Sequence, residues 1–390
     1  MAALLLPPSV VRALDALRRS FLWNMAERAT GAQCLVAWEQ VCRAKSEGSL
    51  GVRHLATQNA CLLLKMLHRL HAAPRSCWAG WIWSSAGGRS LLEHGELALG
   101  EHRASVAKLL PLYRVITRVE VEDGRVCSFW WDCWLPCGPM AVAYPALYSH
   151  TTDVEVTVWQ VRRRGLAKCL VPRLTRTGER KLQAMSALLV TAPSGDGPDM
   201  RRLRHAAAPR NALSSSAAYN LLRFGGAQAG FGDMIWSARV PSRVQFFCWL
   251  LVQRRIHTRD VLLRKCTVNT EEAGCSLCSA PLETADHMLF ACPFTGDFWN
   301  KLGVDTSRVT VCRLPRLVTI VAAVDNSVVE FALLCCWQIW KHRNAVVFQR
   351  QQPSLPHALG CCREDAALWR GRLPENRRGH VESWLHALSL

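Results

Sequence analysis

Three cysteines and one histidine with metal-binding spacing stand close together in this 390-residue chain. They are Cys275, Cys278, His287 and Cys292, in the pattern Cys-x2-Cys-x8-His-x4-Cys. A Cys-x2-Cys pair alone is expected about once by chance among 18 cysteines, and the added His and Cys lower that expectation to roughly 0.05. Zn²⁺ prefers four tetrahedral nitrogen and sulfur ligands. The pattern predicts a closed, structural zinc knuckle. The alternative is a set of core cysteines beside a surface histidine.

The residues around the ligands indicate how the backbone brings them together. The two residues between Cys275 and Cys278 allow a tight turn whose amides point at sulfur, and Thr284 can cap a short helix that carries His287. His287 and Cys292 are five residues apart, which is about 140° out of register on a continuous α-helix. We therefore expect the helix to break at Pro293 and a new helix to begin there, with its apolar face formed by Phe294, Phe298 and Leu302.

The chain is strongly basic. It has 48 Lys and Arg against 30 Asp and Glu, which gives a net charge of +18. Such a charge favours a polyanionic partner, most often nucleic acid, although a solvated basic surface is the plain alternative. The predicted phosphate contacts lie before the zinc stretch: Arg243, Arg254, Arg255, Arg259, Arg264 and Lys265. A second basic cluster falls within residues 162–181.

Apolar periodicity predicts a mainly α fold, with several helical segments, the small Cys3His knuckle and few short strands around the Trp-rich loops and the knuckle. Helices are expected over residues 10–21, 55–70 and 244–252, and from a Thr258 cap to residue 263. Composition divides the chain into four segments: 1–110, helical; 111–232, Trp-rich and then basic; 233–310, zinc-binding; and 311–390, a C-terminal helix and tail. Most of the 16 Trp are expected in the core.

No segment is predicted to cross a membrane, because the longest apolar stretch is short and contains Glu330. Residues 1–11 lack the basic start of a signal peptide, and Pro7 and Pro8 interrupt their apolar run. The protein is therefore expected to be intracellular, nuclear or cytoplasmic, and not secreted. Its cysteines are then core residues or ligands. Weaker metal candidates are Cys335 and Cys336 with His342, and Cys361 and Cys362 with His357.

These motifs together resemble a known family. Cys275-Ser-Leu-Cys278, Glu283-Thr-Ala-Asp-His287, Cys292-Pro293 and Trp299 are similar to the zinc-binding domain at the C-terminal end of plant reverse transcriptases from long-interspersed-type (non-LTR) retrotransposons. The resemblance covers most of residues 7–350, and segment 1–110 resembles the connection that follows the polymerase core. Further matching stretches are Arg19-Ser-Phe-Leu-Trp23, Phe129-Trp-Trp-Asp-Cys-Trp134, Trp337-Gln-Ile-Trp-Lys-His-Arg-Asn344 and Phe348. Ser49, Met66 and Leu203 depart from the family pattern.

Catalysis is not expected. Polymerases and ribonucleases H hold metal ions on clustered carboxylates, and this sequence contains no Asp-Asp pair. The resemblance implies a non-catalytic, retrotransposon-derived module with one structural Zn²⁺ that contacts RNA or an RNA–DNA intermediate, with no small-molecule substrate. Two alternatives stay open: a protein-interaction module that docks on a separate polymerase, and a decayed fragment with no selected function.

Overall fold

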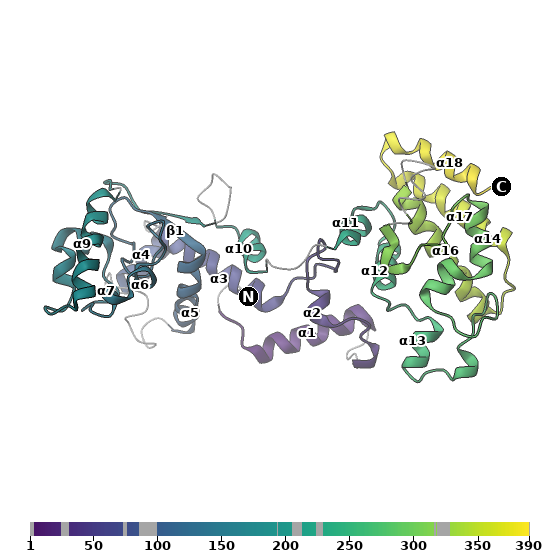
Figure 1. The fold of residues 1–390 in the computed structure, drawn as a ribbon, viewed down its shortest axis with the longest axis horizontal. Helices are drawn as coiled ribbons and strands as arrows, with labels where there is room; N and C mark the ends of the chain where they lie inside the picture. The colour runs from purple at the N-terminus through teal and green to yellow at the C-terminus, as the bar shows by residue number, and fades with distance from the viewer. Residues whose placement is uncertain are drawn as a thin grey trace. The chain divides into compact units, whose positions relative to one another are not determined.

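The computed structural model describes residues 4–24, 31–72, 76–85, 100–192, 194–204, 213–223, 229–315, 317 and 328–389. These residues are mainly helical and contain two short strands, so the predicted fold class is confirmed (Figure 1). The chain divides into two compact units. Unit 1 comprises Met1–Arg18 and His54–Gly225, and unit 2 comprises Arg19–Arg53 and Gly226–Leu390. The four segments drawn from composition stay a prediction.

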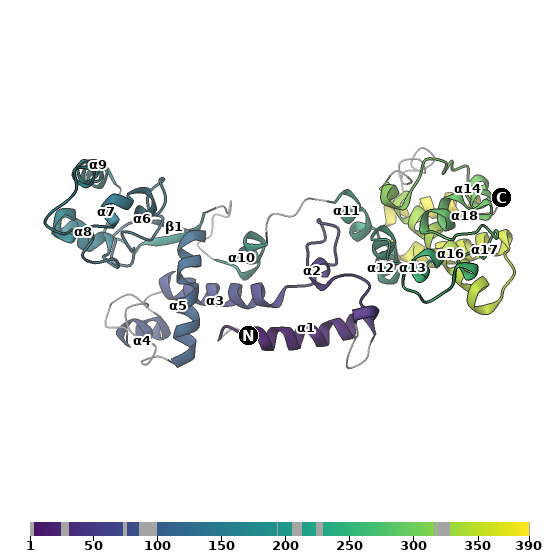
Figure 2. The ribbon, with the colours of Figure 1, turned by 60° about the horizontal axis from the view of Figure 1, so that its bottom comes forward.

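Unit 1 has two small cores. The first lies between α3 (Leu55–Ala72), α4 (Cys77–Ser85), α5 (Gly100–Ile116) and α10 (Ser215–Leu222), which meet through leucines at helical spacing. Helix α3 extends two residues beyond the predicted 55–70. It buries Leu63, Leu64, Leu67 and Leu70 against α5 and α10. The crossing of these helices can be followed in Figure 2.

The second core of unit 1 gathers around the Trp-rich loop. Its elements are β1 (Thr117–Glu120), α6 (Met140–Ala143), α7 (Pro145–Tyr148), α8 (Val158–Arg164), η2 (Leu166–Cys169), α9 (Arg176–Thr191) and β2 (Met200–Leu203). Strand β1 pairs antiparallel with β2, so that Thr117 lies opposite Leu203. The expectation of strands near the Trp-rich loops is met by β1, but β2 comes from the basic stretch, and the described knuckle has no strand. Phe129 and Trp130 are fully buried.

An ion pair buried in unit 1 explains why a strand can carry arginines. Arg201 on β2 donates through Nη1 to Asp132 Oδ1 at 2.9 Å and also bonds Oδ2. Although burial opposes it, the Arg201 guanidinium keeps the pKa of Asp132 below its ordinary value. The side chain of Arg201 is only 5% exposed, so this cation belongs to the core and is not available to a phosphate.

Unit 2 is a helical assembly around one long helix. It contains the end of α1 (Pro8–Trp23), η1 (Gly31–Gln33), α2 (Trp38–Val41), α11 (Gly230–Ser237), α12 (Ser242–Val252), α13 (Arg259–Arg264), η3 (Thr270–Glu272), η4 (His287–Ala291), α14 (Pro293–Lys301), η5 (Val311–Arg313), α16 (Val328–Gln349), α17 (Leu355–Trp369), η6 (Arg370–Arg372), η7 (Glu375–Arg377) and α18 (Gly379–Ala387). Helix α16 contacts α12, α17 and η4. Its central residues, 331–336, are buried, so the whole unit packs around this helix.

The loop after α2 approaches α11 so closely that glycine is needed on both sides. Gly48 has φ of 75°, and a Cβ at Gly232 would stand 2.4 Å from the Lys45 carbonyl oxygen. Ser49, one of the departures from the family pattern, is buried, and its hydroxyl donates to the Gln40 carbonyl. The serine is thus accommodated by a hydrogen bond.

Three of the four cysteines of α16 and α17 are core residues, and the fourth, Cys361, is half-buried. Cys335, Cys336 and Cys362 are fully buried, and burial raises the pKa of both α16 thiols. His342 accepts a hydrogen bond at Nε2 from the Ser354 amide. The described residues contain only one cluster with metal-ligand geometry, and it lies elsewhere. No described helix has the length and apolarity that a membrane span requires.

Candidate metal centre

The four predicted ligands converge. One ligand atom each from Cys275, Cys278, His287 and Cys292 lies within 4.8 Å of the other three, and this is the one such group among the described residues. Cys278 Sγ is 3.2 Å from His287 Nε2. Cys275 and Cys292 are buried, and the other two are half-buried. Three thiols and one imidazole at this separation form the donor set of a structural zinc site, so the residues fit the predicted metal.

A tight turn after η3 presents the first two sulfurs. The Cys275 amide donates to the Ala280 carbonyl at 2.8 Å, and Ser279 closes the turn with φ of 58°. A hydrogen bond from the Cys292 thiol, aided by the amides of Leu277 and Cys278, lowers the pKa of Cys275, although burial opposes this. The same hydrogen bond, together with burial, raises the pKa of Cys292. A lowered pKa favours the thiolate, the form that binds metal, and the amides point at sulfur as predicted.

The last two ligands are joined by a π-turn rather than by a simple helix break. Thr284 Oγ1 accepts from the His287 amide at 3.0 Å, which is the predicted cap. The segment then winds as a π-helix, η4, and the Cys292 amide donates to the His287 carbonyl at 2.7 Å. Bonding between residues five apart widens the turn, so residues that diverge on an α-helix face the same side here. Cys292 itself is extended.

Helix α14 starts at Pro293, as predicted, and packs the knuckle against the rest of unit 2. Phe298 and Leu302 are buried, and the Trp299 indole donates to the Leu289 carbonyl at 2.8 Å. Phe294 stacks on His342 of α16, with ring centroids 5.2 Å apart and planes 7° from parallel. The helix that follows the last ligand is thereby seated directly on α16.

A buried ion pair also holds the spacer between the two ligand pairs. Glu283 and Arg343 are almost wholly buried, and Arg343 Nε donates to Glu283 Oε2 at 3.0 Å, with a second bond of 2.5 Å from Nη2 to Oε1. The Glu283 amide also donates to the Ala273 carbonyl at 2.9 Å. The sequence prediction gave these residues no role. Two features of the sequence could have indicated this pair: Glu283 lies within the ligand pattern, and Arg343 lies within a mainly apolar helix, where a charge needs a partner.

Glu283 also contributes to the cap of α13. Thr258 is the N-cap residue of this helix, as predicted, but its hydroxyl donates to Asp260 Oδ1 at 2.6 Å and accepts from no backbone amide of the helix. Instead, Glu283 Oε1 accepts from the Arg259 amide, and the Glu283 carbonyl accepts from the Asp260 amide. A carboxylate at a helix N-terminus satisfies amides that lack partners and suits the helix dipole.

The predicted basic residues fall into two places. Arg254, Arg255, Arg264 and Lys265 are exposed around α13, and we call them the basic shoulder. Arg259 is half-buried and donates to the Glu272 carbonyl, so it serves the local fold. Arg243 is exposed at the start of α12, with its guanidinium 6.0 Å from the ring centre of Trp337. It stands apart from the shoulder, because the 11-residue helix between them is about 16 Å long.

Arg254 is held in an uncommon conformation. Its φ is 54°, and its amide and that of Arg255 close the end of α12 by donating to Leu251 and Leu250. This turn usually contains glycine, because a side chain is strained there. Arg254 Nη2 reaches Asp286 Oδ2 at 3.1 Å, next to ligand His287. The shoulder therefore adjoins the metal centre.

Comparisons with known proteins bear on this region. Residues 213–299 match a family model described as zinc-binding in reverse transcriptase, and all four ligands lie inside the match. The chain is also similar to the "Putative ribonuclease H protein At1g65750" of Arabidopsis thaliana, with 27% identity over 337 residues, 77% of this chain and 49% of that relative. The chain thus spans about half the length of the curated relative. No solved structure matches.

The comparisons confirm the predicted likeness to the zinc-binding region of reverse transcriptases and, with the Cys3His cluster, point to zinc. The retrotransposon class and the plant origin stay predictions.

Proposed function

We propose that this chain is a non-catalytic, zinc-stabilised module that binds RNA or an RNA–DNA intermediate through its basic shoulder. The observation that carries the proposal is the contact between Arg254 and Asp286, which places the exposed cations beside the Cys3His cluster. The match to a reverse-transcriptase region supports a nucleic-acid partner.

Zinc would be held by the three sulfurs and the imidazole. When bound, it supplies rigidity and folding free energy, of order 10 kcal/mol in small zinc peptides. Three thiolates and Zn²⁺ carry a net charge of −1, which the neighbouring guanidinium of Arg254 offsets. The chain's own part is to hold α13 and its cations in place through Glu283, which contacts both the helix start and α16.

Exposed cations at a fixed spacing contact phosphates without reading bases, so binding should be salt-dependent and weakly selective. Arg255 and Lys265 suit this role, since neither makes an ion pair with any other described residue. Arg264 is also exposed, although Asp260 lies 3.2 Å away.

The proposal of a non-catalytic role rests on how the carboxylates are used. A closed Cys3His set has no position for a reactive water. Asp132 and Glu283 are each buried against an arginine, and Asp199 accepts from three backbone amides. The sequence contains no Asp-Asp pair. Magnesium-dependent cleavage or extension of an RNA–DNA hybrid by the purified chain would refute this part.

Binding is tested by titrating a labelled single-stranded RNA and an RNA–DNA hybrid at several salt concentrations. Each lost phosphate contact lowers the slope of log affinity against log salt by about 0.7 for a single strand. The double variant Arg255→Ala/Lys265→Ala should therefore lower the slope by about 1.4. The matched control, Arg363→Ala/Arg372→Ala, removes the same charge from exposed positions of unit 2 outside the shoulder. Equal slopes for the two variants would refute the assignment.

One observation favours the protein-docking alternative. In unit 2, the Phe21 side chain at the end of α1 is 71% exposed, and aromatic residues are enriched at protein interfaces. Capture of a polymerase by the purified chain after nuclease treatment, lost in a Phe21→Ser variant, would support docking over RNA binding.

A further inference from the structure

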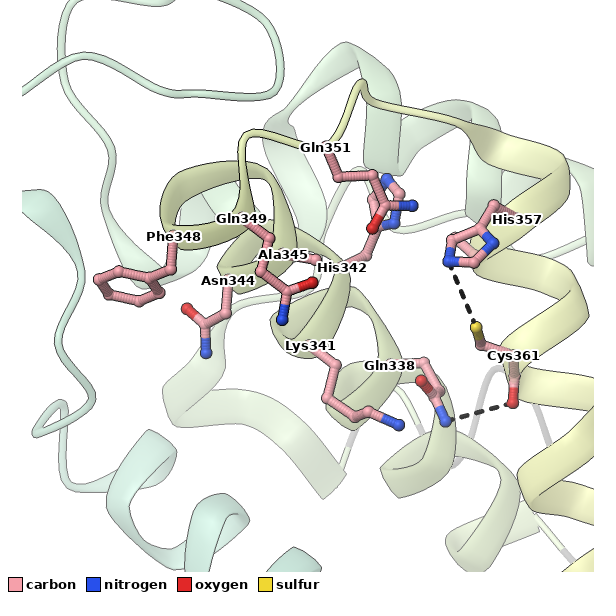
Figure 3. Close-up of a pocket in the computed structure, with 11 residues that line it drawn as sticks. Gln338, Lys341, His342, Asn344, Ala345, Phe348, Gln349, Gln351, His357 and Cys361 are labelled. Atoms are coloured by element: carbon pink, nitrogen blue, oxygen red, sulfur yellow. Dashed lines mark hydrogen bonds between the residues drawn. The ribbon is translucent and has the colours of Figure 1, made fainter.

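A pocket of about 380 Å³ lies between the end of α16 and the start of α17, in unit 2. Its walls come from two helices, and Figure 3 shows side chains of α16 on one side and His357 and Cys361 of α17 on the other. The volume is at the small end of ligand sites, which span roughly 300–1,000 Å³. It suits one small planar group and excludes a duplex.

Amide side chains supply half of the polar side chains of this pocket. Asn344, Gln349 and Gln351 line it, together with Gln338, whose amide donates to the Cys361 carbonyl at 3.2 Å. Asn344 Oδ1 accepts from Arg343 Nη1 at 3.0 Å, which fixes the amide and leaves its nitrogen as a donor. The Gln349 and Gln351 amides make no side-chain hydrogen bond with any described residue. A primary amide offers a donor and an acceptor side by side, the pattern that matches the edge of a nucleobase.

The exposed aromatic ring of Phe348 stands at the edge of the pocket. Phe348 lines the pocket although 77% of its surface is exposed. A phenyl ring on the surface costs solvation free energy without helping the core, and such rings serve as platforms on which unpaired bases stack. Lys341 also lines the pocket, with its Nζ 3.6 Å from Asp365 Oδ2, and the exposed Arg350 follows two residues after Phe348 in the chain.

A metal ion suits this pocket less well. His357 Nε2 lies 3.7 Å from Cys361 Sγ. The third candidate ligand, His342, is engaged at Nε2 by the Ser354 amide and stacks on Phe294. Neutral amides are also poor ligands for the metals that prefer sulfur and imidazole.

The pocket is built on the elements that carry the metal centre. His342 in its wall stacks on Phe294, two residues after ligand Cys292. Arg343, which orients Asn344, is the residue that holds Glu283. The pocket and the basic shoulder therefore belong to the same compact unit, packed around α16.

We infer that this pocket takes one unpaired nucleotide of the bound strand, with its base against Phe348 and its edge facing the amides of Asn344, Gln349 and Gln351. The inference rests on the proposed function. It adds a base-contacting site to a surface that otherwise meets phosphates alone, so the module prefers single-stranded segments to duplexes.

The test compares a single-stranded RNA with an abasic strand of the same length, by fluorescence anisotropy on the full chain with zinc. Phe348→Ala should weaken binding of the RNA about 5- to 150-fold, the range for one stacked base, and leave the abasic strand unchanged. Phe348→Tyr keeps a ring and should restore the affinity. Leu368→Ala removes another exposed apolar side chain, 74% exposed on α17, and should change nothing.

Other outcomes separate this inference from the proposed function. If the wild-type chain binds neither the RNA nor the abasic strand, the proposed function and the pocket assignment are both refuted. If it binds RNA with the expected salt dependence but Phe348→Ala equals Leu368→Ala, the pocket assignment alone fails. Binding of the four free mononucleotides as tightly as the strand would overturn the assignment to a strand and identify a nucleotide site. Because Phe348 is outside the core, its loss leaves the fold intact.

Discussion

Removing one partner of the buried Glu283–Arg343 pair should loosen the metal centre. The two side chains are 0% and 2% exposed and share two hydrogen bonds. A Glu283→Gln substitution keeps the shape of the side chain, and its amide oxygen can still accept from Arg259. It leaves the Arg343 guanidinium charged and without a counter-ion in the core. Such a change costs about 3–5 kcal/mol, a large share of the stability of a typical domain.

The double variant Glu283→Gln/Arg343→Met isolates the pairwise contribution. Methionine fills much of the volume of the arginine stem without its charge, and replacing both partners of a buried ion pair is often close to neutral. We expect the double variant to recover most of the stability that Glu283→Gln loses. The exposed pair of Arg370 and Glu382, at 55% and 68% exposure, is the matched control, since surface pairs contribute about 0–1 kcal/mol.

Hydrogen exchange followed by mass spectrometry is the suitable assay, because unfolding of the whole chain would mix the two units. Peptides of α13 and α16 report the opening free energy of unit 2, and the zinc content of the same samples reports the metal centre. A loss below about 1 kcal/mol for Glu283→Gln would refute the reasoning, since an unpaired buried charge costs more than that. A double variant no more stable than the sum of its singles would refute the pairing.

Two further outcomes follow from the buried and metal-binding groups. His287→Ala should lower the zinc content of the purified chain by about one equivalent and increase exchange in η4 and α14, measured by metal analysis and hydrogen exchange; full zinc in the variant would exclude His287 as a ligand. Burial lowers the pKa of His71 from 6.5 to about 3. As the pH falls, His71 is protonated in the unfolded chain before it is protonated in the folded chain. Its contribution to the free energy of unfolding is therefore fully present above pH 6.5 and is lost toward pH 3, by at most about 1.4 kcal/mol per pH unit. Hydrogen exchange of α3 and α5 peptides at pH 7.5 and 5, corrected for the intrinsic exchange rates, should show a smaller acid loss of opening free energy in His71→Gln than in the wild type; an equal loss would assign the acid sensitivity to other groups.

Local patterns were sufficient for some of the helices and for the convergence of the ligands, whereas helices such as α9 (Arg176–Thr191) and α17 (Leu355–Trp369) had no predicted range. Helix α3 follows from its apolar periodicity, and the four ligands lie in one short stretch where spacing, a threonine cap and a proline constrain the backbone. For this stretch, the prediction missed only the π-helical form of the turn between His287 and Cys292. The i+5 bond of η4 depends on packing by α14 and α16, because isolated π-turns have no strong residue signal.

Partners far apart in the chain could not be read from residue spacing. Glu283 bonds Arg343, 60 positions away, and Arg201 bonds Asp132, 69 positions away. A charged residue looks the same in the sequence whether it ends in solvent or in the core. Thr258 stands at the predicted N-cap position, but the tertiary fold brings in Glu283, which accepts from the Arg259 amide, while the threonine hydroxyl bonds Asp260.

The linear sequence was enough to identify which residues can bind a metal, because donor chemistry and short spacings are properties of a local segment. Which arginines remain available to a phosphate, and which α16 side chains line a pocket, depends on how distant helices pack. Burial and pairing are set by free energies that belong to the whole fold.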